Sequence, residues 1–447
     1  MARFFPKLFV AACLLFLALA PTARGEFYSP VMPKNLDRVE VSLITVGIGS
    51  ELYQLWGHTA IRLKDPDSMT DVVAQWGFFD FEAPHFAWNF FRGILTYRFG
   101  FQNYDDTIRT YVMERRSVWS DRLNLTPTQK ERLIRKLIWN AQPENRPYRY
   151  YYFFDNCSTR PRDLIDDALA GAFKERFGKG LSDFTFRDMV RQHMAVQPFS
   201  GMSLDVLMNN NLDRPMSVWE EMFLPVALRR YLSQMPAIDD GGQPRLGETL
   251  LQDAHQLLEY PAPVPPQHNG FHIVVLPFAL LLCAALAAAA IRTAGAQRLF
   301  WRILGVTSWC WGGLFGAYGL VMIVAWLCSE HQDLLHNANL WFFWPTDLPV
   351  LFWMGWRWVW KDFSPGRDAI ERFALLYAGA HLLGFALEVT LSFLGVIGQN
   401  TQQIGAYFGP LLIFFWGMIF KMAGMNGLAP FNKDRTNRPS SVAEMLS

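Results

Sequence analysis

The chain has 447 residues and a formal net charge of +1, and 51% of its residues are hydrophobic. This length suits two or three domains, and the near-zero charge gives no basis for nucleic-acid binding. The apolar residues are concentrated in long runs, which excludes a single ordinary soluble domain.

The first 25 residues have the pattern of an export signal. Arg3 and Lys7 precede an apolar run over residues 8–20, and small residues follow that run. The pattern predicts a signal peptide or signal anchor over 1–25, whether or not it is cleaved. The domain that follows is therefore expected outside the cytoplasm.

A small antiparallel sheet is expected at the start of the exported domain. Residues 38–48 alternate as in a strand, and further strands are expected over 59–63 and 71–76. His58 follows Gly57 and opens the second of these strands.

The next segment, residues 78–101, is unusually rich in aromatic side chains. Two interpretations stay open for it. It forms an aromatic layer of the core, or it forms a groove for an acyl chain or a surface that rests on a bilayer.

The second half of the exported domain is expected to be mainly helical. Thr126, Pro127 and Gln129 are typical of a capped helix start, and that helix is expected to end near Ala141. Residues 163–235 also favour helices, and 236–270 are interpreted as a stiff Pro-rich linker.

Cys157 lies between a predicted strand and a predicted helix. The aromatic run 150–154 predicts a strand, Asp155-Asn156 favour a turn, and helical spacing follows from Asp163. Amide groups and the dipole at a helix N-terminus favour a thiolate. A buried structural cysteine is the alternative.

The cysteine count favours a reactive thiol. The chain has five cysteines, and Cys157 is the only one between residues 26 and 270. In an oxidising compartment, a lone cysteine has no intrachain partner, which suggests a nucleophile.

A thiol nucleophile needs a base, and the base needs an orienting group. His58 is the candidate base, against the alternative of a satisfied core histidine. Gln75 on the next strand is the candidate orienting residue, and Asp71 is its rival.

The second half of the chain predicts a polytopic membrane domain. Five apolar segments are long enough to span a bilayer: 271–291, 303–328, 340–360, 373–397 and 404–423. Lys and Arg gather after the first, third and fifth segments, whereas the loops 329–339 and 398–403 contain none. The first span therefore starts outside, and the tail 424–447 is expected in the cytoplasm.

Two polar features accompany the predicted spans. The outer loop 329–339 contains His331 and Asn337 and is interpreted either as a solvated loop or as a polar lip that holds a lipid headgroup or positions substrate. Glu388 lies within the fourth span on one helical stripe with Tyr377 and His381. It is expected either to act at headgroup level or to bind a neighbouring helix. No metal-ligand spacing stands out, and no cofactor is expected.

Several motifs resemble one family. The chain is similar to the periplasmic domain of Lnb-type lipoprotein N-acyltransferases in the segments Trp56-Gly57-His58-Thr59-Ala60-Ile61-Arg62, Gln75-Trp76-Gly77-Phe78-Phe79-Asp80-Phe81 and Asp155-Asn156-Cys157-Ser158-Thr159-Arg160. The loop from His331 through Asn337-Ala338-Asn339-Leu340-Trp341 to Pro345 resembles the membrane part of that family. The family usually has Asn where this chain has Gln75.

The resemblance implies a fold and a reaction. It implies an α+β, permuted papain-like (NlpC-like) exported domain over 26–235, with Cys157 as nucleophile and His58 as base. It also implies transfer of an acyl chain from phospholipid to the N-terminal cysteine of a lipoprotein at the bacterial inner membrane. Candidate substrate-binding residues are Asn156, Thr159, Arg160, His331, Asn337, Asn339 and Glu388.

Two other functions stay open at this stage. A papain-like thiol peptidase or amidase acting on cell-wall peptide would use the same Cys–His pair. A lipoprotein-binding factor without catalysis would need neither group.

Overall fold

The computed structural model describes residues 31–79, 85–265, 294–360 and 369–427. The expected signal over 1–25 and the first expected span over 271–291 lie outside these residues, as does most of the expected cytoplasmic tail. The chain forms two compact units, which are residues 1–270 with 324–336, and residues 271–323 with 337–447.

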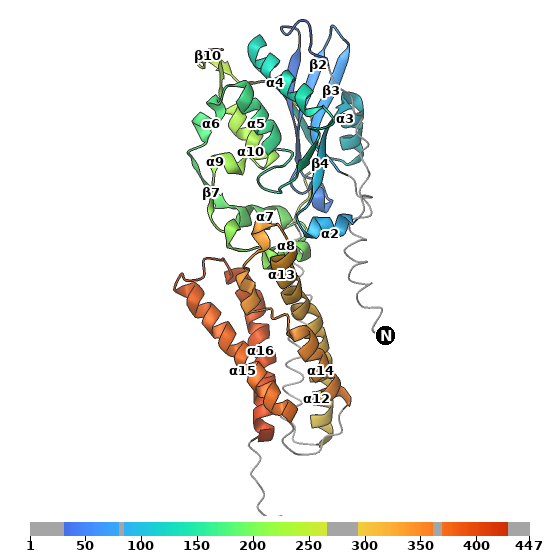
Figure 1. The fold of residues 1–447 in the computed structure, drawn as a ribbon, viewed down its shortest axis with the longest axis vertical. Coiled ribbons are helices and arrows are strands. Elements are labelled where there is room, and N and C mark those ends of the chain that lie inside the picture. The colour runs from blue at the N-terminus through green and yellow to red at the C-terminus, as the bar shows by residue number, and fades with distance from the viewer. Residues whose placement is uncertain (1–30, 80–84, 266–293, 361–368, 428–447) are drawn as a thin grey trace, which may run out of the picture. The chain divides into compact units, whose positions relative to one another are not determined.

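The first unit is built on an antiparallel sheet of seven strands in the order β11-β5-β1-β2-β3-β4-β6 (Figure 1). In chain order these are β1 (Glu40–Val46), β2 (His58–Asp65), β3 (Thr70–Phe78), β4 (Thr96–Asn103), β5 (Val118–Leu123), β6 (Pro147–Arg149) and β11 (Leu251–Leu258). The three strands expected at the start of the domain are confirmed as β1, β2 and β3, which pair in sequence order.

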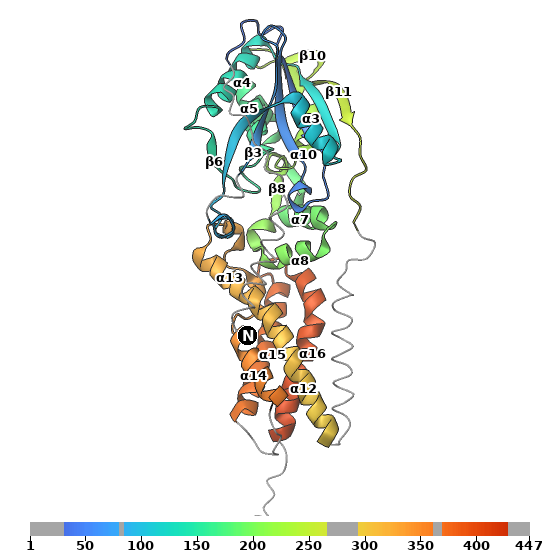
Figure 2. The same cartoon turned by 90° about the vertical axis from the view of Figure 1, so that its right-hand side faces the viewer.

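Helices cover both faces of this sheet, with α3 on one face and α4 and α5 on the other (Figure 2). The helices are α2 (Phe86–Phe91), α3 (Tyr104–Met113), α4 (Pro127–Asn140), α5 (Thr159–Ala168), α6 (Ala172–Phe177), α7 (Phe186–Met194), α8 (Pro198–Leu207), α9 (Val218–Glu221) and α10 (Pro225–Ser233). Two short hairpin-like pairs accompany them, β7 (Leu181–Thr185) with β8 (Pro215–Ser217), and β9 (Pro236–Ile238) with β10 (Pro244–Thr249).

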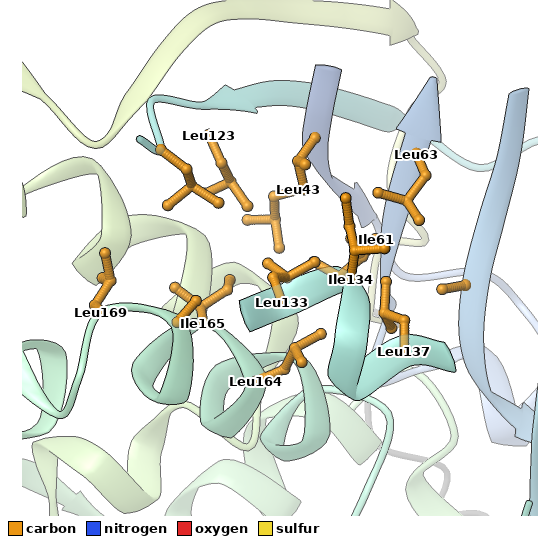
Figure 3. Close-up of a cluster of buried hydrophobic side chains, with 14 of the residues drawn as sticks. Leu43, Ile61, Leu63, Leu123, Leu133, Ile134, Leu137, Leu164, Ile165 and Leu169 are labelled. Carbon is orange, nitrogen blue, oxygen red and sulfur yellow. The ribbon is translucent and has the colours of Figure 1, made fainter. Parts of the chain in front are cut away.

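Alternation along the strands fills two separate apolar layers. Leu43 and Ile61 point to the main core, where they meet Leu133 of α4 and Ile165 of α5 (Figure 3). Residues of the opposite parity, such as Val46 and Ala60, pack with Tyr111 of α3. Because side chains alternate across a strand, this parity also decides to which face each polar residue of β2 and β3 belongs.

The capped helix start is confirmed. Thr126 accepts a hydrogen bond from the Gln129 amide, and the Gln129 side chain bonds the Thr126 amide in return. Pro127 occupies the first turn, where its missing N–H costs nothing.

Two predictions of local structure are wrong. The aromatic run 150–154 is not a strand, because β6 ends at Arg149 and a tight turn joined by the Tyr151–Asp155 bridge follows. Residues 236–258 are not a linker, because they form β9, β10 and β11, and β11 pairs with β5 at the edge of the main sheet. Leu250 lies in the main core and Leu251 packs against it, so this segment is attached to the sheet. The nearby prolines favoured a linker in the sequence.

The second unit consists of helices. They are α12 (Ala294–Trp311), α13 (Ala317–Cys328), α14 (Asp347–Trp360), α15 (Ala369–Phe393) and α16 (Gln402–Gly427), with a π-helical turn at Gly312–Gly316 between α12 and α13. In the described residues, three segments are long and apolar enough to cross a membrane: Trp301–Cys328, Arg372–Phe393 and Gln402–Phe420. The expected span over 340–360 corresponds to α14, which has 14 residues.

Glycines bring α14 close to its neighbour, as their spacing predicts. A Cβ on Gly316 would lie 2.3 Å from the Leu348 amide nitrogen, and one on Gly312 would lie 2.8 Å from the Asp347 carbonyl oxygen. Only glycine permits such an approach of two helix backbones, which is the packing device expected in membrane bundles.

Candidate active site

His58 begins β2 at the end of the sheet where that strand leaves β3. It pairs with Val46 of β1, whereas the pairing of β2 with β3 starts only at Ile61 and Ala74. The imidazole therefore lies in a gap between strands. Gly77 makes room for it, because a Cβ on Gly77 would lie 3.1 Å from His58 Cε1.

Gln75 fixes the tautomer of His58. His58 Nε2 donates a hydrogen bond to Gln75 Oε1 at 3.2 Å, so Nδ1 carries the lone pair that is able to accept a proton. Gln75 Nε2 in turn donates to Gln102 Oε1 at 2.8 Å, which holds the amide in this orientation. The rival Asp71 instead binds Arg62 with both carboxylate oxygens, at 2.7 and 2.6 Å.

Cys157 precedes α5 by two residues, in the turn that replaces the predicted strand. Its thiol takes a hydrogen bond from the backbone N–H of Thr59, the residue that directly follows His58. The start of β2 and the start of α5 thus bring the only cysteine of residues 26–270 to the backbone next to the candidate base.

The turn around Cys157 is held by its neighbour Asn156. Asn156 Oδ1 accepts from the Ser158 and Thr159 amides at 2.8 and 2.9 Å, and Nδ2 donates to the carbonyls of Tyr152 and Phe223, both at 3.0 Å. These bonds occupy two amides at the helix start, so neither is free to stabilise an oxyanion. The amide of Cys157 itself faces its own thiol.

Thr159 and Arg160 are also engaged inside this turn. Thr159 Oγ1 accepts from the Asn156 amide at 2.8 Å, and Arg160 binds both oxygens of Asp155, at 2.5 and 2.6 Å. Their contact with a substrate stays a prediction, since the bonds seen here position the nucleophile.

The thiol and imidazole are both neutral near pH 7. Burial lowers the pKa of His58 to about 4, and the Arg116 cation adds to this, while the hydrogen bond to Gln75 opposes it. Burial raises the pKa of the Cys157 thiol to about 11, against the opposing effects of the Thr59 N–H, Arg116 and its own N–H. At rest the site therefore contains a neutral thiol and an unprotonated imidazole.

Aromatic side chains surround the pair. Phe79 and Tyr150 stack on Tyr97 with ring centroids 4.9 and 4.2 Å apart, and Trp56 meets Tyr152 edge to face at 5.0 Å. The segment 78–101 thus divides between the two interpretations, since Phe99 and Phe101 lie in the core while Trp88 and Phe90 are each 48% exposed.

His331 lies in the short second segment of the first unit, residues 324–336. Its Nε2 donates to the Phe90 carbonyl at 3.1 Å, while the carbonyls of Gln332 and Leu335 accept from Asn209 Nδ2 at 2.7 and 2.6 Å. Glu330 forms an ion pair with Arg149. Most polar groups of this loop therefore bind the first unit itself.

The other three candidate residues lie in the second unit. Asn337 Oδ1 accepts from the Asn339 amide and from Gln399 Nε2, at 2.8 and 3.0 Å. Glu388 Oε1 accepts from Ser392 and Thr401 hydroxyls at 2.9 and 2.6 Å. These contacts match the helix-binding alternative for Glu388, and any headgroup role stays a prediction.

Part of the first unit has a counterpart among known families. Residues 33–192 match the family model described as the Lnb N-terminal periplasmic domain. This stretch belongs to that family. It contains β1 to β7 and most of α7, and therefore His58, Gln75 and Cys157. No curated protein and no solved structure matches the chain.

The Lnb-type domain and the three apolar helices together fit a membrane protein with a periplasmic N-terminal domain. Within the described residues, no group of three His, Cys, Asp or Glu side chains is placed to hold a metal ion. Motif reasoning named Cys157, His58 and Gln75, and the structure bonds the last two to each other, while their catalytic roles stay a prediction. That reasoning missed Gln102 and Arg116, because nothing in the sequence marks residues that reach the site only through strand register.

Proposed function

We propose that this protein is a membrane-bound thiol acyltransferase that moves an acyl chain from a phospholipid, through a thioester on Cys157, to an amine. One observation carries the proposal: a solitary thiol bonds the backbone next to a histidine whose Nε2 is held by an amide. This is the arrangement of a nucleophile with an oriented base.

The first half-reaction is acylation of the thiol. Cys157 Sγ attacks the ester carbonyl of the phospholipid while His58 Nδ1 accepts the thiol proton. When the tetrahedral intermediate collapses, the C–O bond breaks and the proton on His58 passes to the leaving alkoxide. The products are an S-acyl enzyme and a lysophospholipid.

The second half-reaction transfers the chain. A neutral amine attacks the thioester, His58 accepts its proton, and the C–S bond breaks to return the thiol with that proton. The resemblance to the Lnb-type family makes the N-terminal cysteine of a lipoprotein the proposed acceptor. No cofactor or nucleic acid takes part in this scheme.

The proposed setting is the outer face of a bacterial inner membrane. A permuted papain-like domain would lie in the periplasm, multiple spans would anchor it, and the C-terminus would be cytoplasmic. The positive residues after the first, third and fifth expected spans support this orientation.

The decisive experiment is intact mass spectrometry of the full-length protein after incubation with phospholipid. We expect an acyl adduct that hydroxylamine removes, together with released lysophospholipid, and neither with Cys157→Ser. His58→Ala should slow adduct formation by a factor of about 100 to 10,000.

The matched control is Cys310→Ser, which removes a free cysteine of the second unit and should leave the adduct unchanged. An adduct that persists in Cys157→Ser would refute the proposed nucleophile. Folded wild type that forms no adduct, but cleaves a cell-wall peptide, would instead establish the peptidase alternative.

A further inference from the structure

Arg116 is a buried cation on the same face and at the same end of the sheet as His58. Val118, Val46 and His58 form one row across β5, β1 and β2, so Arg116 lies two residues beyond that row. Strands two apart in a sheet are about 10 Å apart, a span that an arginine side chain largely bridges. Arg116 also bonds the end of β1 directly, because its Nε donates to the Gly47 carbonyl at 3.0 Å.

The charge of Arg116 is only partly balanced. Its side chain is 5% exposed, and Glu114 binds one terminal nitrogen, Nη1, at 3.0 Å. Within the described chain, the other terminal nitrogen, Nη2, is buried without a hydrogen-bond partner. A guanidinium with one satisfied edge keeps a strong field in a low-dielectric interior.

Among the described residues, Arg116 is the charged group named in the electrostatics of both the thiol and the imidazole. Gln75 and the Thr59 amide contribute dipoles, and the Asp155–Arg160 pair beside the turn is closed on itself. The remaining titratable neighbours of Cys157 are phenols whose raised pKa keeps them neutral: Tyr97, Tyr111, Tyr148, Tyr150 and Tyr152. Arg116 itself also faces Glu114, Tyr53 and Tyr111.

We propose that Arg116 is a positioning residue of the active site, whose buried and only partly balanced guanidinium supplies positive potential at the end of the sheet where His58 lies. It forms no bond to substrate and acts through the field at the two reacting groups. The inference rests on the proposed acyl transfer. It agrees with the direction in which Arg116 moves the pKa of both groups.

The test is the pH dependence of Cys157 alkylation by iodoacetamide, followed at the peptide level in the full-length protein. A cation at about 10 Å and an effective dielectric constant of 20 changes a thiolate population by about tenfold. We therefore expect Arg116→Gln to alkylate about ten times more slowly at pH 8, and Arg116→Lys to recover much of the loss. Because no acyl donor is present, this readout is independent of whether the protein transfers acyl chains.

Glu114→Gln should change the alkylation rate of Cys157 in the opposite direction. It keeps Arg116 but removes the carboxylate that partly balances it, so Cys157 should alkylate faster than in the wild type. Damage to the fold would expose the thiol and raise the alkylation rate at every pH, whereas the proposed effect moves the midpoint of the pH profile to lower pH. The midpoint is therefore the readout, and this variant also serves if Arg116→Gln does not fold.

Arg62→Gln is the matched control. Arg62 lies on the same face of β2, but both Asp71 oxygens hold it and it stacks over Tyr104 at 3.4 Å. It should leave the alkylation profile unchanged. Unchanged profiles in both folded Arg116→Gln and Glu114→Gln would overturn the proposal, as would an equal loss in Arg62→Gln.

Discussion

The imidazole ring of His58 occupies a space beside β3 that is open because Gly77 has no side chain. A Cβ on Gly77 would approach Cε1 to 3.1 Å, which is closer than most carbon atoms come. The orientation of the base thus depends on the absence of a side chain as well as on the bond to Gln75. Precise placement of a catalytic group matters, since a shift of about 1 Å can cost 100-fold in rate.

Replacing Gly77 tests this dependence. Gly77→Ala should push the imidazole out of its hydrogen bond and lower the rate of acyl-enzyme formation by about 100-fold. Formation of the hydroxylamine-labile adduct measures the rate. Gly241→Ala, whose Cβ would meet only Asp239 at 3.3 Å, is the control and should keep the wild-type rate. An active Gly77→Ala enzyme would show that the ring has freedom that the structure does not indicate.

At this scale the sequence predicts some residues and not others. Cys157 was identifiable because it is the only thiol in a long exported segment, and His58 because a glycine and a strand start mark it. Arg116 lies 58 residues after His58 and 41 before Cys157. Only the register of β5 on β1 brings it near them, and single-sequence patterns do not contain strand register.

Among the elements, the segment 324–336 contains a carboxyl, that of Asp333, whose pKa is changed by burial. Asp333 is largely enclosed, and burial raises the pKa of its carboxyl to about 6 although Arg214 lowers it. Its backbone carbonyl accepts from the Asn209 amide at 2.8 Å, so the loop backbone is attached at the same residue. A carboxyl with a raised pKa stabilises the folded form below its unfolded pKa, near 3.8, and this contribution is lost as the pH rises through about 6.

The attachment of this loop should therefore weaken between pH 5 and pH 7. Hydrogen exchange of the Asn209 amide, corrected for the intrinsic effect of pH, should show greater protection at pH 5. Asp333→Asn should remove the difference and keep protection high at both values. Glu330→Gln, which alters the exposed pair with Arg149, should leave the pH dependence intact. Equal protection of the wild type at both pH values would contradict the argument.

The predictions of helices and strands were correct where the local sequence determines the structure. They were wrong where contacts with residues distant in sequence determine it. The capping box at Thr126 defines its helix from local sequence alone. The aromatic run after Arg149 has every local preference of a strand, yet Asn156 and the Tyr151–Asp155 bridge fold it into a turn. Residues 251–258 lie next to prolines and read as a linker, but the open edge of β5 recruits them as a strand.

At the scale of the whole molecule, the second unit encloses a polar centre of its own. His381 Nε2 lies 2.9 Å from Asp347 Oδ1, and Tyr377 donates to the same oxygen at 2.7 Å. Trp416 and Trp344 cover the imidazole, with ring centroids 3.9 Å away on each side. Asp347 is 0% exposed, so the carboxyl depends entirely on these partners.

Removing one partner of this pair should be costly. His381→Ala removes one polar neighbour of the buried Asp347 carboxyl and should lower the free energy of unfolding by about 1–3 kcal/mol, because a buried polar group that loses a partner is costly. Thermal unfolding in detergent measures the loss. The double variant Asp347→Leu/His381→Leu should recover most of it. If His381→Ala melts with the wild type, the pair does not stabilise the bundle.

The first unit is not one continuous stretch of chain, and this affects how the protein is made. Asn209, Arg149 and the carbonyls of Phe90 and Arg92 each gain a partner from residues 329–336. These residues are synthesised after the helix that ends at Cys328. At ribosomal rates of about 5–20 residues per second, this leaves an interval of several seconds after residue 265. In the proposed topology, the contacts of the exported domain with this segment would form only at the end of that interval. The last step of its folding would therefore be coupled to membrane insertion.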